Sequence, residues 1–207
     1  MDNWLHNITD KDILQDNLTF SSMYIAVYEY MTDHVESYIK DFLCDYCIKD
    51  GKEHYKETTS YRSEIKQRVV DEKGNKDKTK ASFLWLVDND AISQDDYNTF
   101  LTAKEVRNRY AHELTNVILY GITEREIRLF FELYALFQKI NKWFFINIEA
   151  PIMGEDIPND ADLESVMTGA DIVFDMVINV LYNGKSDDYK SIIAEAERIM
   201  NGQDESE

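Results

Sequence analysis

The fold is decided by the stretch TEREIRLFFELYALFQKINKWFFINI, residues 123–148. Apolar residues recur in it at steps of three and four, which is the spacing of one face of an α-helix. Thr123 and Glu126 form the capping-box pattern with which a helix begins. Because the apolar arc is wide, we predict that this helix is the central and most buried element of the protein.

Around this helix the chain carries further helical patterns and few residues that interrupt them. Hydrophobic residues make up 44% of the 207 residues, while Gly and Pro number only 7 and 2, which favours long helices over strands and turns. The pattern predicts an all-α fold, a bundle of four to five core helices followed by two additional C-terminal helices. The predicted helices cover residues 17–48, 58–71, 81–87, 93–120, 123–148, 166–181 and 186–199, after a short helix or arm within 1–15.

We predict one helical bundle over residues 1–150, with an acidic connector and the C-terminal helices of residues 151–207 packed on the same domain. The chain has no apolar run near 18 residues, and no charged-then-apolar start with a cleavage site. We therefore expect a soluble, cytoplasmic protein that makes no membrane contact.

The net charge of −18, with an isoelectric point near 4.5, has the wrong sign for sequence-independent attraction to nucleic acid. One local exception exists, because residues 56–80 hold eight Lys/Arg against five Asp/Glu. Within it, residues 71–80 have no periodicity and are predicted to form a solvated loop, whose lysines could also meet a phosphate backbone.

The two cysteines form a single C-x-x-C, Cys44 and Cys47. A structural zinc site needs four ligands, and no second pair follows. A mononuclear site that adds His54 is the alternative, but two reduced cysteines on a helix are favoured. We predict no metal and no cofactor.

The polar stretch VRNRYAHE, residues 106–113, interrupts the apolar pattern of the 93–120 helix, which begins at a capping box of Ser93 and Asp96. Asn108 and His112 are neighbours one helical turn apart. Arg107 falls instead in the middle of the apolar arc, where a guanidinium needs a carboxylate, a carbonyl or an anionic ligand.

Two interpretations of this stretch are open. Arg107 bridges to an acidic residue of a neighbouring helix and His112 is a polar surface residue, or both belong to a phosphodiester-cleaving site. Histidine exchanges a proton near neutral pH, and arginine holds a phosphate and the charge that develops on it. Lys104 and Arg109 are the candidate substrate-binding cations. RNA cleavage needs both a base and an acid, and a symmetric dimer would bring together two copies of His112.

Arg107-Asn108-x-x-x-His112 on the middle helix of an all-α chain resembles the R-N-x-x-x-H motif of the HEPN superfamily, and Ala111 before the histidine is also typical. The likeness covers roughly residues 17–148. The resemblance implies a homodimer with a composite, metal-independent ribonuclease site at its interface. Arg107 and His112 would be catalytic, with Asn108 as the supporting polar residue, and the products would carry 2′,3′-cyclic phosphate ends.

HEPN ribonucleases include toxins and abortive-infection proteins, so the resemblance also implies a role in antiviral defence and an antitoxin or operon partner. Position 114 is Leu114, where one HEPN branch has a tyrosine modified by its antitoxin. The alternatives are a non-catalytic helical dimer that binds a protein partner, and a helical bundle that binds a nucleotide without cleaving it.

Overall fold

The computed structural model divides the chain into two compact units, Met1–Val166 and Met167–Glu207. It describes residues 4–49 and 51–153, and in the second unit the single positions 168, 169, 171, 172, 175, 176 and 179. No helix in these described ranges is both long enough and apolar enough to cross a membrane.

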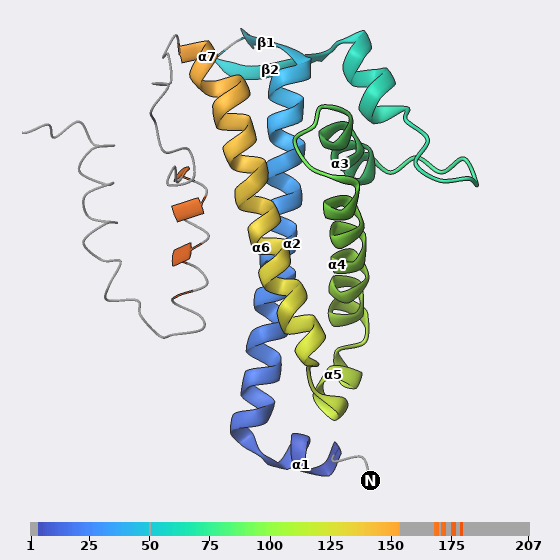
Figure 1. The fold of residues 1–207 in the computed structure, drawn as a ribbon, viewed down its shortest axis with the longest axis vertical. Coiled ribbons are helices and arrows are strands. Elements are labelled where there is room, and N and C mark those ends of the chain that lie inside the picture. The colour runs from blue at the N-terminus through green and yellow to red at the C-terminus, as the bar shows by residue number, and fades with distance from the viewer. Residues whose placement is uncertain are drawn as a thin grey trace, which may run out of the picture. The chain divides into compact units, whose positions relative to one another are not determined.

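The first unit is built on three long helices that run side by side (Figure 1). They are α2 (Lys11–Leu43), α4 (Gln94–His112) and α6 (Glu124–Phe144), and α3 (Lys78–Asp88) packs against α2 and α4. The prediction of a predominantly α-helical protein is confirmed. The helices meet in a cluster of buried aromatic rings, with centroids 5.3 to 6.4 Å apart, formed by Phe20, Tyr24, Tyr110 and Phe130.

Helix α6 follows the prediction closely. The hydroxyl of Thr123 accepts from the backbone N–H of Glu126, whose carboxylate accepts in return from the backbone N–H of Thr123. Gly121 precedes the helix with a φ of 78°, a backbone conformation that favours glycine. The helix continues into a π-helical turn, η2 (Phe145–Glu149), and a short helix, α7 (Ala150–Met153). The predicted connector therefore begins as helix.

The prediction of one helix over residues 17–48 is wrong at both ends. A short helix, α1 (Trp4–Thr9), is followed directly by α2, for which Asp10 provides the N-cap. At the other end, α2 stops at Leu43 and the chain forms an antiparallel hairpin of β1 (Cys44–Lys49) and β2 (Lys52–Glu57). This hairpin and the pair α1 and α5 lie at opposite ends of the bundle (Figure 1).

The loop of the hairpin has a recognisable sequence signal. Lys49 pairs with Lys52, so the loop between the strands consists of the two residues Asp50-Gly51. Asp-Gly is among the strongest signals for a two-residue hairpin loop, and Gly51 has a φ of 69°. The C-x-x-C therefore lies on a strand. Cys44, at the start of β1, is buried, and Cys47 is exposed like the rest of the strand.

The segment after the hairpin is less helical than predicted. Of residues 58–71, which were predicted to be helical, only residues 59–66 are, and most of these form a π-helical turn, η1 (Tyr61–Lys66). In the predicted loop of residues 71–80, Lys76 forms an isolated bridge with Val69, and the last three residues belong to α3. Asp77 provides the N-cap of α3, so this helix begins slightly earlier than predicted.

The helix predicted over residues 93–120 is interrupted. It consists of α4 and α5 (Leu114–Tyr120), which are separated by Glu113 with a φ of −124° and a ψ of 34°. His112 is therefore the last residue of α4. In the second unit, the described positions 169, 171, 172, 175, 176 and 179 are helical, within the helix predicted over residues 166–181. The predicted helix of residues 186–199 lies outside the described residues.

Candidate functional site

The polar stretch around Arg107 lies on the last two turns of α4, where successive side chains point to different neighbours. The N-terminus of this helix is held by the capping box that the sequence predicts, and Lys139 of α6 adds a hydrogen bond of 2.5 Å to Asp96. At 100° per residue, Arg107 and Arg109 are separated by 200° around the helix axis. Arg107 therefore faces α2, and Arg109 faces α6.

Arg107 pairs with Glu29 of α2, which identifies the partner that its place in the apolar arc requires. Its Nη1 donates a hydrogen bond of 3.0 Å to the Oδ1 of Asn108. The Arg107 side chain is 26% exposed. Burial, together with the charge of Glu29, raises the pKa of the neighbouring Tyr28, and the positive charge of Arg107 opposes this shift.

Asn108 and His112 are exposed, as is every residue from 111 to 116. Within the described part of the chain, His112 has no hydrogen-bond or ion-pair partner. Ala111 and Leu114 lie in this exposed stretch, and Leu114 is 40% exposed. A single continuous helix was predicted over residues 93–120, but α4 ends at His112 and α5 begins at Leu114.

The two predicted substrate-binding cations are both engaged within the chain. Arg109 pairs with Glu126 at the start of α6, and its guanidinium lies 5.2 Å from the centroid of the Tyr110 ring. Lys104 Nζ lies 2.7 Å from Oδ2 of Asp77. Burial acts to raise the pKa of Asp77, but hydrogen bonds from Lys104 and from the backbone of Lys80 outweigh it, so that the pKa is lowered.

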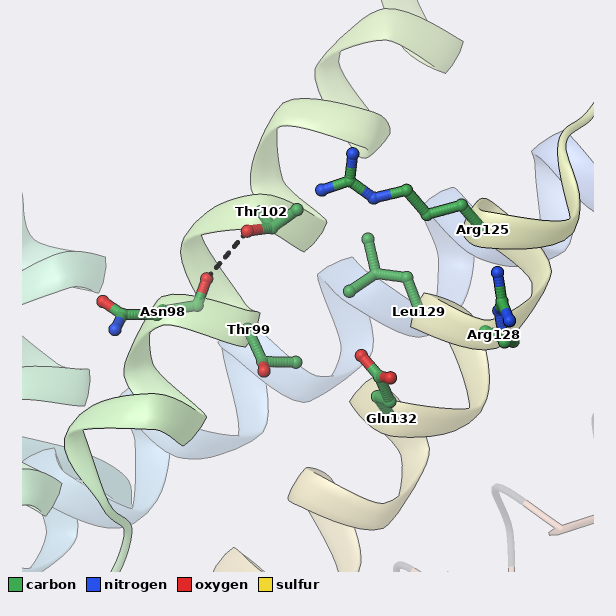
Figure 2. A pocket seen from close by; sticks show the side chains of 7 residues that line it. All are labelled: Asn98, Thr99, Thr102, Arg125, Arg128, Leu129 and Glu132. Carbon is green, nitrogen blue, oxygen red and sulfur yellow. Dashed lines mark hydrogen bonds between the residues drawn. The ribbon is translucent and has the colours of Figure 1, made fainter.

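The sequence prediction missed a groove between α4 and α6. One cavity in it, of about 260 Å³, is lined by Asn98, Thr99, Thr102, Arg125, Arg128, Leu129 and Glu132. In Figure 2 the Arg125 side chain reaches from α6 towards α4, while Leu129 and Glu132 point into the space between the two helices. A second cavity, of about 420 Å³, shares Thr102, Arg125 and Leu129 with the first and adds Glu105, Val106, Thr123 and Glu126. We call these two adjoining cavities the α4–α6 groove.

The only sequence signal for the groove is the pair Arg125 and Arg128 on the polar side of a strongly amphipathic helix. This signal does not say which helix faces the two arginines. For metals, no group of three or more His, Cys, Asp or Glu side chains in the described ranges is arranged to hold an ion. Burial raises the pKa of the Cys44 thiol, which disfavours the thiolate form that binds metals.

In comparisons with known proteins, no family model matches the chain, and no curated protein or solved structure gives a significant match.

Proposed function

We propose that this protein is a metal-independent endoribonuclease of HEPN type that acts as a homodimer, in the role of a toxin or phage-defence effector. The observation that carries the proposal is the exposed imidazole of His112, one helical turn beyond Asn108, whose amide oxygen is held by Arg107. A proton-transferring group, an amide and a cation thus lie within the last two turns of α4.

The three side chains provide the groups that cleavage of a phosphodiester requires. His112 of one copy takes the proton of the 2′-hydroxyl, whose oxygen attacks the adjacent phosphorus. The bond to the 5′-oxygen breaks, and His112 of the second copy gives that oxygen a proton. Arg107 stabilises the charge on the phosphate oxygens, and Asn108 orients the Arg107 side chain. The products are a 2′,3′-cyclic phosphate and a 5′-hydroxyl.

The second copy has a surface available next to the site. Leu114 and Tyr120 of α5 are 40% and 65% exposed, and Ala111 beside His112 is also exposed. Apolar and aromatic side chains of this kind are enriched in the centre of protein interfaces. A two-fold contact through this surface would bring the two copies of His112 to one site.

Glu29 is the residue that an RNA phosphate must displace from Arg107. Its side chain is 42% exposed, and ion pairs with this exposure contribute only about 0–1 kcal/mol. A phosphate oxygen can therefore take the place of the Glu29 carboxylate at little cost. In the absence of RNA, Glu29 keeps the guanidinium in position.

The second candidate function is a non-catalytic helical dimer that binds a protein partner. The ion pair between Arg107 and Glu29 favours it, because it gives Arg107 a structural role between α4 and α2. The net charge of −18 also favours a partner other than nucleic acid.

The deciding experiment incubates the purified protein with total RNA in the presence of EDTA and maps the product ends. We expect 2′,3′-cyclic phosphate ends, and a loss of cleavage of about 100-fold or more in His112→Ala. His54→Ala is the matched control, because His54 is also exposed but lies on the hairpin. Cleavage that persists equally in both variants would identify a contaminating nuclease, and the absence of cleavage by the wild type would favour the second candidate.

A second test uses growth of a bacterial host. We expect expression of the wild type to slow growth, and His112→Ala or Arg107→Ala to relieve this effect. Equal growth inhibition by the wild type and both variants would contradict the role of the site.

A further inference from the structure

Among the described residues, the arginines that have no acidic partner both lie in the α4–α6 groove. Four of the six arginines in the described ranges are held in ion pairs: Arg62, Arg68, Arg107 and Arg109. The remaining two, Arg125 and Arg128, both line the smaller cavity of the groove, and both are exposed. In a chain with 40 Asp and Glu residues, two unpaired arginines at one cavity mark a place where an anion can bind.

The wall opposite these arginines is polar and belongs to α4. The Thr102 hydroxyl donates to the backbone carbonyl of Asn98 at 2.9 Å, so its oxygen can still accept from a ligand. The Asn98 amide group can donate, and on the α6 side of the groove the Glu132 carboxylate can accept. Cations suited to phosphate thus stand beside an amide and a carboxylate, which are the groups that read the edges of unpaired bases.

The α4 side of the groove leads to His112. Asn98, Thr102, Glu105, Arg109 and His112 follow one another at steps of four and three residues, so they form one stripe along α4. At 1.5 Å per residue, Thr102 and His112 are separated by roughly 15 Å along the helix. That distance corresponds to about four stacked nucleotides at 3.4 Å each.

We propose that the α4–α6 groove binds single-stranded RNA, with Arg125 and Arg128 on backbone phosphates and the strand running along α4 to His112. This inference rests on the proposed ribonuclease function and identifies its substrate-binding cations. Arg109 and Lys104, the cations predicted from the sequence, are instead held by Glu126 and Asp77.

The position of the two arginines suits this role. Both lie near the start of α6, where the aligned backbone dipoles also favour negative charge. Glu105 and Glu132 lie in the same groove and repel phosphates that are displaced from the arginines. The groove is therefore expected to bind a single strand in one path, and the net charge of −18 suppresses binding elsewhere on the chain.

The test measures binding of a fluorescein-labelled single-stranded RNA of 20 nucleotides by fluorescence anisotropy. His112→Ala serves as the parent, so that cleavage does not interfere. Adding Arg125→Gln and Arg128→Gln should weaken binding about 10-fold or more at 0.1 M salt, and should lower the salt slope of log K by about 1.4 for two lost phosphate contacts. Lys52→Gln with Lys56→Gln, two exposed lysines of β2, removes the same charge away from the groove and should change binding less than about 2-fold.

The possible outcomes separate the two proposals. The groove is supported if RNA binding is lost when the two arginines are substituted and kept when the two lysines are substituted. Circular dichroism must show that both variants are folded. If the wild type cleaves RNA but the arginine variant binds RNA as well as the lysine variant does, the proposed role of the groove is overturned and the proposed ribonuclease function stands. If the wild type does not cleave RNA and the His112→Ala parent does not bind it, both proposals fail.

Discussion

Two ion pairs on opposite sides of α4 use the same residue types and differ in their surroundings. On the α2 side, Arg107 pairs with Glu29, whose side chain is 42% exposed. On the α6 side, Arg109 pairs with Glu126, whose side chain is 9% exposed. Glu126 also accepts hydrogen bonds from the backbone N–H of Thr123 at 2.9 Å and from its hydroxyl at 3.0 Å. In the described part of the chain, the Glu29 carboxylate has no partner besides Arg107.

The difference assigns different roles to two arginines that are only two positions apart. A buried carboxylate must have its charge compensated, so Glu126 and Arg109 depend on each other and join α6 to α4. The pair of Arg107 and Glu29 stays in contact with water, so its charges are screened and its partners can be exchanged. The first pair is therefore structural, and the second is suited to a site that opens for a ligand.

Removing the buried carboxylate should have the largest effect on stability. Glu126→Ala takes away half of the capping box and leaves Arg109 without its partner, so we expect the free energy of unfolding to fall by about 2–4 kcal/mol. Glu29→Ala is the matched control and should cost less than about 1 kcal/mol. Urea unfolding at pH 7 measures both values. Equal losses in the two variants would mean that the pairs do not differ as their exposure indicates.

Substituting the two arginines should show the same contrast in stability as substituting their glutamate partners. Arg109→Ala should lower the free energy of unfolding by about 1–3 kcal/mol, because it leaves the buried Glu126 carboxylate without its cation. Arg107→Ala should lower it by less than about 1 kcal/mol and should nevertheless abolish RNA cleavage. Thermal unfolding and the cleavage assay on the same samples test this. A variant Arg107→Ala that is destabilised as much as Arg109→Ala would favour the structural role of Arg107.

Low pH should weaken the contact between α4 and α6 that Asp96 makes with Lys139. Burial acts to raise the pKa of this carboxyl, but hydrogen bonds from Lys139 and Ser93 outweigh it, so the pKa is lowered from 3.8. A group with a lowered pKa in the folded state contributes stability above its unfolded pKa and loses it as the pH falls through the folded value. Stability should therefore decline below about pH 3.8, and Asp96→Asn should cost about 1 kcal/mol at pH 7 and flatten this decline. Urea titrations between pH 7 and pH 3 compare the free energy of unfolding of the wild type and of Asp96→Asn. If the two free energies fall in parallel with pH, the assignment of the decline to Asp96 is contradicted.

The smallest effect is expected from Tyr28 on the α2 side. Its ring stacks on Phe100 of α4 with centroids 5.8 Å apart, and in the described part of the chain its buried hydroxyl has no hydrogen-bond partner. Tyr28→Phe keeps the stacking and removes the unpaired hydroxyl, so the free energy of unfolding should stay unchanged or rise by up to about 1 kcal/mol. A loss of more than about 1 kcal/mol in urea unfolding would show that the hydroxyl is bonded. Tyr24→Phe is a useful comparison, because its hydroxyl donates to the carbonyl of Ala103 at 3.5 Å.

The features that were predicted correctly are local ones. Both capping boxes, at Ser93 and at Thr123, involve groups only three residues apart and therefore form in any context that allows the helix. The hairpin of residues 44–57 was missed although Asp50-Gly51 carries its signal. The apolar spacing before it continues a helical period as far as Phe42, and Gly also ends helices. A short exposed strand has too few buried positions to reveal its period of two.

The sequence by itself determined the presence of the long helices, the starting points of α4 and α6, and the presence of an arginine and a histidine on the same polar stretch of α4, because each depends on neighbours within a few residues. Only the tertiary structure decided that Arg107 meets Glu29, that Arg109 is held by Glu126, and that Arg125 and Arg128 lie at a groove. These contacts join helices that are distant in the chain. They depend on how each helix is rotated about its axis when the apolar faces pack, and the periodicity of a single helix does not contain that rotation.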